Sequence, residues 1–365
     1  MSFEEICFSS NPNFRFQEYV SEKSDCLSST CQFDCYKNKD GEAILISPFF
    51  DYDNILKQEH HICLINLKNN KVIAKLEGHN DRVITVRYFQ DPETKKEYLI
   101  SSDRKNKIII WNLSNNYSKI LEIYSQIDNE DLDYNQKKSE GFIYSCLLIF
   151  EQKKIWSAYS FNSQNNIPRA FNINNINEVI NIKCSENVSY FKIFYLDYWY
   201  NKEAMIEKRH NIILCGEYNI IIVQFPKNTI YHRIETDKNY PNNLASIVFK
   251  NKDKDMLAFS STYGLIQIFD LNKRIIIRSI ELQYVHLMNF IKWNDRFLLV
   301  NDSLQRKIMV LDMKDDYKIR SLVLCPEMHF DRFIKKVDHP IYGESILSIG
   351  TDWKIKLFVN RNIIK

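Results

Sequence analysis

Residues 76–113 read LEGHNDRVITVRYFQDPETKKEYLISSDRKNKIIIWNL, and this stretch decides the fold. It opens with Gly78-His79 and closes with Trp111-Asn112, and three short apolar runs lie between these pairs. The runs are rich in Val, Ile, Tyr and Phe, whose β-branched and aromatic side chains suit the pleated surface of a sheet. Turn-forming residues such as Arg104-Lys105-Asn106 separate the runs. The stretch therefore predicts three antiparallel strands, and the run SKILEIY at 118–124 predicts a fourth.

The same pattern of four apolar runs recurs along the chain. Seven units align, and the positions after their third runs are separated by 46, 60, 52, 46, 42 and 46 residues. A unit of this size cannot bury its apolar face alone, so repeats of this period stack against one another. In five units the third run ends alike: Ile65-Asn66-Leu67, Trp111-Asn112-Leu113, Phe171-Asn172-Ile173, Phe269-Asp270-Leu271 and Leu311-Asp312-Met313.

The spacing from Gly78-His79 to Trp111 resembles one unit of the WD-repeat family, although the dipeptide here is Trp-Asn rather than Trp-Asp. The whole chain resembles a divergent member of that family, whose units form the blades of β-propellers. The resemblance implies an all-β fold, a single seven-bladed β-propeller of four-stranded antiparallel blades over residues 1–365. The expected blades are 26–77, 78–125, 141–184, 187–236, 243–282, 284–325 and 328–360.

The last of these units shows only three apolar runs, and RNIIK alone follows Val359. A blade with a missing strand would expose a row of unpaired backbone N–H and C=O groups. We therefore expect a strand within residues 2–20, in the N-terminal region 1–25, to complete the last blade and close the ring.

Composition limits the classes of function. The chain is 45% hydrophobic, which is ample for a core. Its 49 basic and 46 acidic residues give a net charge of +3, with no basic stripe of the kind that follows a phosphate backbone, so nucleic acid is a disfavoured partner. Only 7 residues are Gly, whereas Asn, Ile and Lys are abundant. We interpret this as the coding bias of an AT-rich, protist-like genome, in which Asn replaces Gly at turns because it tolerates positive φ.

The N-terminal sequence MSFEEICFSS lacks an apolar segment, so neither a signal peptide nor a transit peptide is expected. No apolar run approaches the ~18 residues of a membrane-spanning helix. The nine cysteines are odd in number and scattered, which favours a reducing compartment. The sequence therefore predicts a cytoplasmic protein, with a cytoskeletal or ciliary location left open.

The WD-repeat resemblance also implies a structural tetrad of His, Ser or Thr, Asp and Trp. In the second unit His79, Ser101 and Trp111 fit this set. The expected Asp position, six residues before Trp111, is Lys105, while Asp103 lies two residues earlier. The resemblance implies that these side chains satisfy buried polar groups, which is a structural role and not a catalytic one.

The last unit carries a second, incomplete version of the tetrad. His329, Ser348 and Asp352 fit the pattern, whereas Phe358 occupies the Trp position. Each tetrad is therefore expected to lack one member, and the other units are more degraded.

Other candidate constellations are weaker than their structural alternatives. Three cysteines and two histidines invite a zinc interpretation, but their spacing contains no Cys-x-x-Cys pair, so no metal or other cofactor is expected. Asp338-His339-Pro340 is interpreted as a turn, because no nucleophile motif accompanies it. No glycine-rich phosphate loop occurs, and the Phe-Arg-Arg-Gly motif of phosphoinositide-binding propellers is absent. The zinc candidates are Cys26, Cys31, Cys35, His60 and His61.

The entry loops and the turns between second and third strands of a propeller lie on one rim. Here they would gather basic and aromatic residues of the kind that anchor protein partners, with acidic residues interleaved. The alternative is an ordinary solvated rim. The candidate partner-binding residues are Arg82, Arg104, Lys105, Arg306, Arg332 and Trp353, and the interleaved acids are Asp81, Asp103, Asp302, Asp331 and Asp352.

The resemblance implies a non-enzymatic platform that binds other proteins, a monomeric propeller within a hetero-complex, and we expect a scaffold or adaptor. The first alternative is a stoichiometric structural subunit of a large assembly, such as a ciliary axoneme or another cytoskeletal complex. A propeller that binds nucleic acid or phosphoinositide is a further alternative, and an enzyme is the least favoured class, since fold alone does not define function.

Overall fold

A computed structural model describes most of the chain. Its regular structure consists of 28 strands, and no helix occurs among the described residues. No helix in that part is long and apolar enough to cross a membrane. The described ranges are 14–18, 32–50, 60–124, 143–161, 167–184, 190–199, 209–216, 218–235, 242–261, 264–282, 285, 287–305, 307–324, 333–341, 343–349 and 355–360.

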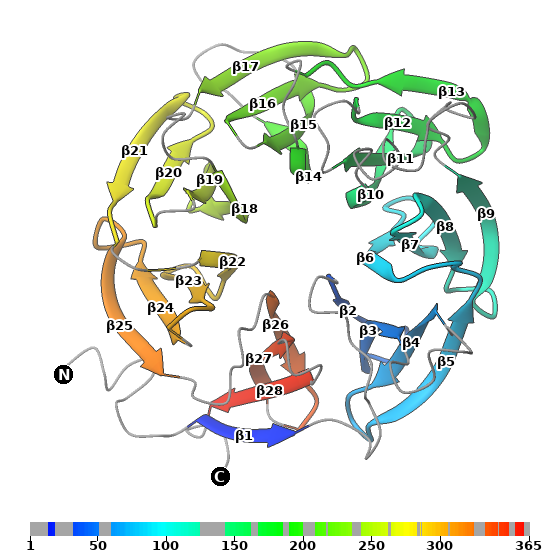
Figure 1. The fold of residues 1–365 in the computed structure, drawn as a ribbon, viewed down its shortest axis with the longest axis horizontal. Coiled ribbons are helices and arrows are strands. Elements are labelled where there is room, and N and C mark those ends of the chain that lie inside the picture. The colour runs from blue at the N-terminus through cyan, green and yellow to red at the C-terminus, as the bar shows by residue number, and fades with distance from the viewer. Residues whose placement is uncertain are drawn as a thin grey trace, which may run out of the picture. The chain divides into compact units, whose positions relative to one another are not determined.

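The strands form seven antiparallel sheets of four strands each, which is the architecture of a seven-bladed β-propeller (Figure 1). Six sheets are simple meanders of four consecutive strands, so each corresponds to one sequence unit. This confirms the fold expected from the repeating apolar runs. The chain divides into two compact units.

One unit contains residues 1–57, 63–75 and 243–365, and most of four sheets lie in it. Its strands are β1 (Phe14–Glu18), β2 (Asp34–Lys37), β3 (Ala43–Phe50), β4 (His60–Asn66), β5 (Lys71–Glu77), β18 (Asn242–Asn251), β19 (Lys254–Ser261), β20 (Ile266–Asp270), β21 (Ile275–Ile280), β22 (Leu287–Lys292), β23 (Phe297–Asp302), β24 (Lys307–Asp312), β25 (Lys318–Leu324), β26 (Phe333–His339), β27 (Gly343–Ile349) and β28 (Ile355–Asn360).

The other unit contains residues 58–62 and 76–242, with three sheets. Its strands are β6 (Val83–Gln90), β7 (Glu97–Asp103), β8 (Lys107–Asn112), β9 (Ser118–Tyr124), β10 (Ile143–Glu151), β11 (Lys154–Phe161), β12 (Arg169–Asn172), β13 (Asn175–Asn181), β14 (Tyr190–Trp199), β15 (Arg209–Gly216), β16 (Asn219–Gln224) and β17 (Thr229–Glu235).

The seventh sheet joins the two ends of the sequence. Its order is β1-β28-β27-β26, and β1 pairs with β28 from Phe14 opposite Asn360 to Glu18 opposite Lys356. In Figure 1 the blue arrow of β1 lies beside the red arrow of β28. The expectation that an N-terminal strand completes the last blade is confirmed, because β1 covers the edge that β28 would otherwise expose.

The hydrophobic cores lie between successive sheets of each unit. One core joins β18–β21 to β22–β25 through residues such as Ile268, Leu298 and Leu311. Another joins β6–β9 to β10–β13 through Ile100 and Ile143. Within each unit, successive sheets thus bury faces against one another, as the repeat period predicts.

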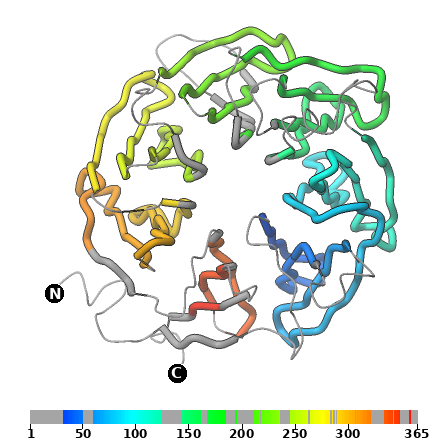
Figure 2. The backbone as a smooth tube through the Cα atoms, in the orientation of Figure 1, coloured from blue at the N-terminus to red at the C-terminus, as the bar shows by residue number. Residues whose placement is uncertain are grey.

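Burial within a sheet depends on the position of the strand. Every residue of β7 is buried, whereas β9 is mostly exposed, with partly buried residues at Leu121 and Ile123. The third strand β8 is buried from Lys107 to Trp111. Figure 2 follows this sheet as a continuous coloured tube through its four strands. The middle of the sheet is therefore the rigid, fully packed part.

Asparagine takes the place of glycine at several tight turns. Asn70, Asn106, Asn116 and Asn228 all have φ between 48° and 61°, a left-handed conformation that Asn tolerates better than most residues. The low glycine content is thus compatible with the many turns that 28 strands require.

Candidate functional site

Two loops meet at one end of the sheet β6–β9. The first, residues 78–82, enters β6, and the second, residues 103–107, connects β7 to β8. Val83 pairs with Asp103, and the Arg104 N–H donates to the Arg82 carbonyl oxygen at 3.0 Å. This strand pairing brings the two loops side by side.

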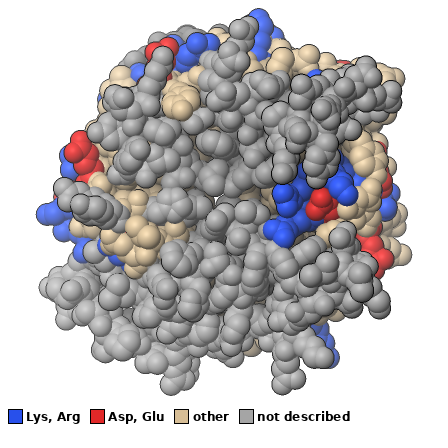
Figure 3. Space-filling model, in the orientation of Figure 1, with Lys and Arg blue, Asp and Glu red and all other residues tan. Residues whose placement is uncertain are grey.

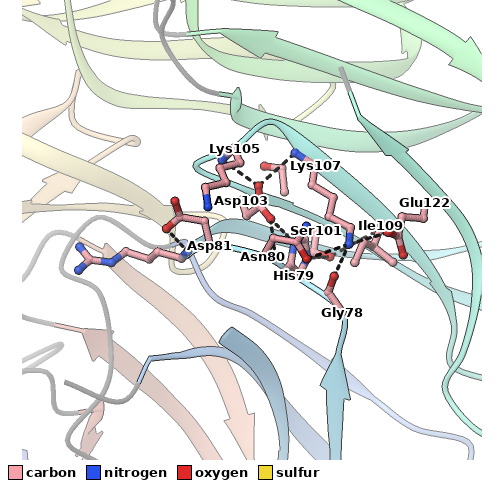
Figure 4. A network of polar contacts seen from close by, with 12 residues as sticks. Gly78, His79, Asn80, Asp81, Ser101, Asp103, Lys105, Lys107, Ile109 and Glu122 are labelled. Carbon is pink, nitrogen blue, oxygen red and sulfur yellow. Dashed lines mark hydrogen bonds and ion pairs between the residues drawn. The ribbon is translucent and has the colours of Figure 1, made fainter. Parts of the chain in front are cut away.

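A chain of buried polar contacts crosses the sheet below these loops (Figure 4). The Trp111 Nε1–H donates to Ser101 Oγ at 3.0 Å, and Ser101 Oγ lies 2.7 Å from His79 Nε2. His79 Nδ1 lies 3.1 Å from Asp103 Oδ2. The partners indicate a neutral imidazole that donates from Nδ1 to the carboxylate and accepts from the serine hydroxyl at Nε2.

This arrangement of Ser, His and Asp is a structural group, since no substrate can reach it. The side chains of His79 and Asp103 are fully buried, and Ser101 is also 0% exposed. Burial lowers the pKa of His79 below its ordinary value of 6.5, and the hydrogen bond and charge of Asp103 oppose that shift only in part. The group therefore satisfies buried polar atoms inside the sheet.

Lys105 occupies the position where the tetrad Asp was expected, and the expectation that this tetrad lacks a member is wrong. Asp103 supplies the carboxylate, from the last residue of β7. Lys105 instead stands exposed at the tip of the turn. The spacing counted from Trp111 misses this acid by two residues, because Asp103 ends β7 opposite Val83 and so lies beside the entry loop that carries His79.

Asp103 also ties the two loops together. Its Oδ1 accepts from the Lys105 N–H at 2.9 Å and the Lys107 N–H at 3.1 Å, which fixes the turn. Its Oδ2 accepts from the Asn80 N–H at 3.2 Å as well as from His79. One buried carboxylate thus holds both loops, and charge-assisted hydrogen bonds of this kind are stronger than neutral ones. No signal in a single sequence marks this double role except the position of the acid at the end of a strand.

A buried lysine, Lys107, links the entry loop to the fourth strand of the sheet. Lys107 is 4% exposed at its side chain, and its Nζ lies 2.5 Å from Glu122 Oε1 and contacts the Gly78 carbonyl oxygen. Gly78 has φ of 146°, a backbone conformation that L side chains rarely adopt. This conformation favours glycine in the entry loop.

Arg82, Arg104 and Lys105 are the surface residues of this pair of loops, and we call them the basic platform. Arg104 and Lys105 are exposed and Arg82 is partly buried. Figure 3 shows basic residues gathered around an acidic spot on the side of the face where β6 and β7 lie. The partly buried Asp81, whose Oδ1 accepts from the Arg82 N–H at 2.6 Å, lies in the same loop.

The remaining sequence candidates are distributed differently. Asp103 and Asp302 are both 0% exposed, so their expected place on the exposed rim is wrong. Each ends a second strand and accepts backbone N–H groups of the turn that follows, which draws the carboxylate inward. Ser348 is buried in β27. His329, Asp352, Arg306, Arg332, Trp353 and Asp331 lie outside the described residues.

Of the residues that suggested a metal or acid–base site, Cys35, His60, His61 and His339 lie in the described part of the chain. Cys26 and Cys31 lie outside the described residues, and burial raises the pKa of Cys35 to about 12. The described residues contain no group of three or more His, Cys, Asp or Glu that could hold a metal ion. His339 ends β26, where its Nδ1 accepts from the Ile341 N–H at 3.1 Å. That contact belongs to the turn that the sequence predicted.

Comparisons with known proteins place the fold. No protein-family profile matches the sequence, and no curated protein matches it. Among solved structures, BBS1N, crystallised in complex with ARL6DN and soaked with lead, is similar with a TM-score of 0.64 at 10% identity, covering 95% of this chain and 97% of that one. The β-propeller domain of Cps50 (Swd1) from Myceliophteria thermophila is similar with a TM-score of 0.66 at 11% identity, covering 94% and 99%. The chain therefore has the fold of a seven-bladed β-propeller.

Proposed function

We propose that this protein is a non-enzymatic scaffold or adaptor that binds other proteins in the cytoplasm, as a divergent WD-repeat propeller. The observation that carries the proposal is the basic platform. Three cationic side chains lie on two short loops that a buried carboxylate fixes in place. A surface that is already ordered loses little conformational entropy on binding, so it suits recognition.

The comparisons support the proposal at the level of architecture. A protein of the same fold, BBS1N, was crystallised in complex with ARL6DN. Propellers present their loops on rigid sheets, and arginine is enriched among the residues that anchor protein interfaces. The polar group of His79, Ser101 and Asp103 has a structural role here, since it is fully buried.

The proposal is tested by comparing which proteins co-purify with matched variants of the full chain from native extract. The double variant Arg104→Glu/Lys105→Glu reverses the charge of the platform. The control, Lys95→Glu/Lys96→Glu, changes the same charge at exposed positions in the turn between β6 and β7. This turn is at the other end of β7, roughly 20 Å away for a strand of this length.

We expect the natural chain and the control to retain the same partners, and the platform variant to lose at least one that mass spectrometry identifies reproducibly. Equal partner sets for all three proteins, with equal melting temperatures, would contradict the use of this surface.

A further inference from the structure

We infer that one corner of the sheet β18–β21 docks onto the surface of a bilayer that contains anionic lipids. The corner lies where the turns before β19 and β21 meet the outer strand, which Figure 1 shows as the yellow arrow of β21 at the edge of its sheet. This inference goes beyond the proposed function and does not depend on it. We call the surface the lysine–isoleucine corner, and its residues are Lys252, Lys254, Lys273, Ile275, Ile276 and Ile277.

The lysines and the isoleucines belong to the same end of the sheet. Asp270 of β20 pairs with Met256 of β19 on one side and with Ile275 of β21 on the other. Adjacent strands lie about 4.8 Å apart, so the starts of β19 and β21 are ~10 Å from each other. The turns at 252–253 and 271–274 therefore project from one end of the sheet, beside the exposed start of β21.

The three lysines of the corner are available to a ligand. All three are exposed, and their side chains make no hydrogen bond or ion pair with any described residue. Arg274 and Arg278 differ, since each has a contact within the protein, such as that of Arg278 with Asp316 Oδ2 at 3.2 Å. The exposed Asp253 lies in the turn with Lys252 and offsets one of the three charges, so an excess of positive charge remains.

The isoleucines add an apolar surface beside these charges. Ile275, Ile276 and Ile277 are consecutive and are 51%, 42% and 40% exposed. Contiguous exposed apolar residues next to polar ones mark interaction sites. On a bilayer, lysines are attracted to anionic head groups, and aliphatic side chains enter the boundary between head groups and acyl chains. The corner offers both kinds of contact at one end of one sheet.

A bilayer fits this corner better than a protein or a nucleic acid. The register between β20 and β21 shifts so that Ile277 is an extra residue in β21, and a bulge of this kind hinders the pairing of an edge strand with another strand. Protein interfaces are enriched in arginine and aromatic residues and depleted in lysine, which is the opposite of this composition. A phosphate backbone would bind the lysines and leave the isoleucines exposed.

The test measures co-sedimentation of the full-length protein with lipid vesicles. Vesicles of phosphatidylcholine mixed with phosphatidylserine supply the anionic surface, and vesicles of phosphatidylcholine alone are the neutral control. We expect the protein to bind the anionic vesicles only, and the binding to weaken as salt shortens the screening length. Absence of binding to the anionic vesicles, or equal binding to both kinds, would overturn the inference.

A pair of charge variants tests the role of the lysines. Lys252→Glu/Lys254→Glu should weaken binding to the anionic vesicles at least about tenfold, because each cation near an anionic surface adds to the attraction. Lys95→Glu/Lys96→Glu makes the same change of charge in the exposed turn between β6 and β7, and it should weaken binding by less than about twofold. Equal weakening by both variants would mean that total charge, and not this corner, binds the vesicles.

A second pair tests the role of the isoleucines. Ile275→Ser/Ile276→Ser should weaken binding at least about tenfold, because the apolar contact with the bilayer is lost. Ile176→Ser/Val179→Ser is the control on the outer strand β13, where both residues are 51% exposed, and it should leave binding unchanged. Binding by the first variant within about twofold of the natural chain would contradict a bilayer as the ligand.

Equal melting temperatures of the four variants and the natural chain show that each variant is folded. If Lys252→Glu/Lys254→Glu loses co-purifying proteins while the natural chain does not bind the anionic vesicles, the corner binds a protein and this inference fails. The proposed function stands in that case, since its own test uses a different surface.

Discussion

The sheets β6–β9 and β22–β25 have the same strand order, but polar side chains lie at the centre of the first and apolar side chains at the centre of the second. Their second strands both end in a buried Asp, Asp103 paired with Val83 and Asp302 paired with Leu287. The position two residues earlier is Ser101 in one sheet and Val300 in the other. Both residues are 0% exposed.

The third strands differ in the same way. Trp111, opposite Leu99, corresponds to Leu311, opposite Leu298. In β6–β9 the tryptophan donates to the buried serine, whereas Leu311 belongs to an apolar core. A blade can therefore have either a complete set of hydrogen-bonded polar side chains or apolar side chains at its centre, because both leave few buried polar atoms unsatisfied.

Both sheets have a buried aspartate at the end of the second strand. Asp103 Oδ1 accepts from Lys105 and Lys107, and Asp302 Oδ1 accepts from the N–H groups of Leu304 and Gln305. The turn between the second and third strands requires this acceptor, since its backbone N–H groups have no partner in the sheet.

The largest effect is expected from truncating the two third-strand residues. Trp111→Ala should lower the free energy of unfolding by about 3–5 kcal/mol and Leu311→Ala by about 2–5 kcal/mol, because each leaves a cavity in a packed core. Urea denaturation of both variants measures this. A loss below about 1 kcal/mol for Trp111→Ala would show that its burial contributes little to stability.

A smaller effect is expected from exchanging the chemistry of the central position. Ser101→Ala removes the partner of both the Trp111 N–H and His79 Nε2, so it should cost about 1–3 kcal/mol. Val300→Thr places a hydroxyl in the apolar core and should cost a similar amount, about 1–3 kcal/mol. If either variant were as stable in urea as the natural chain, a polar and an apolar residue could replace one another at this central position without loss of stability.

Acid should destabilise the protein through its buried histidines. Burial lowers the pKa of His60, His79 and His339 below 6.5, so the unfolded chain binds protons more readily as the pH falls below that value. Their stabilising contribution is present above pH 6.5 and is lost below it, by up to about 1.4 kcal/mol per pH unit for each histidine. Urea titrations between pH 7.5 and 5 measure the slope, and His79→Gln should flatten it. An unchanged slope in that variant would mean that His79 is not held neutral by the fold.

The smallest effect concerns the end of the third strand, where Asn112 corresponds to Asp312. The Asp312 carboxylate accepts hydrogen bonds from Nε and Nη2 of Arg296, and its Oδ2 lies 3.4 Å from Arg320 Nε. Burial alone would raise the pKa of Asp312, but the hydrogen bonds from Arg296 and the Lys314 N–H, with the charges of Arg296 and Arg320, outweigh burial and lower it.

The variant Asp312→Asn keeps an oxygen for the Lys314 N–H, as Asn112 does for the Ser114 N–H. We expect a loss of about 1 kcal/mol, because both arginines remain partly exposed to water. A loss as large as that of Trp111→Ala would show that the ion pairs dominate this turn.

Much of the polar group could be inferred from one sequence. The apolar runs, the Gly-His entry and the period of the third strands predicted the sheets, and His79, Ser101 and Trp111 do lie in contact. Asp103 was missed because sequence spacing assumes a turn of fixed length. The carboxylate that contacts His79 belongs to the last residue of β7, which pairs with Val83 beside the entry loop, and only the tertiary structure shows this contact.

The surface was less predictable than the core. Asp103 and Asp302 were expected to interleave with the rim cations, yet both are buried under their turns. The carboxylate of an acidic residue near a turn can either face solvent or accept hydrogen bonds from backbone N–H groups, and the alternation of apolar residues does not distinguish these two positions.

The sequence by itself determined the class of fold, the number of strands in a repeat and the need for a closing N-terminal strand, because side-chain alternation and unpaired edges are local properties. Only the tertiary structure decided which acid joins His79, which sheet is filled by apolar residues and which of the rim acids are buried. Those outcomes depend on contacts between segments that lie far apart in sequence, such as Asp103 with Asn80, and their energies follow from burial, which no single segment specifies.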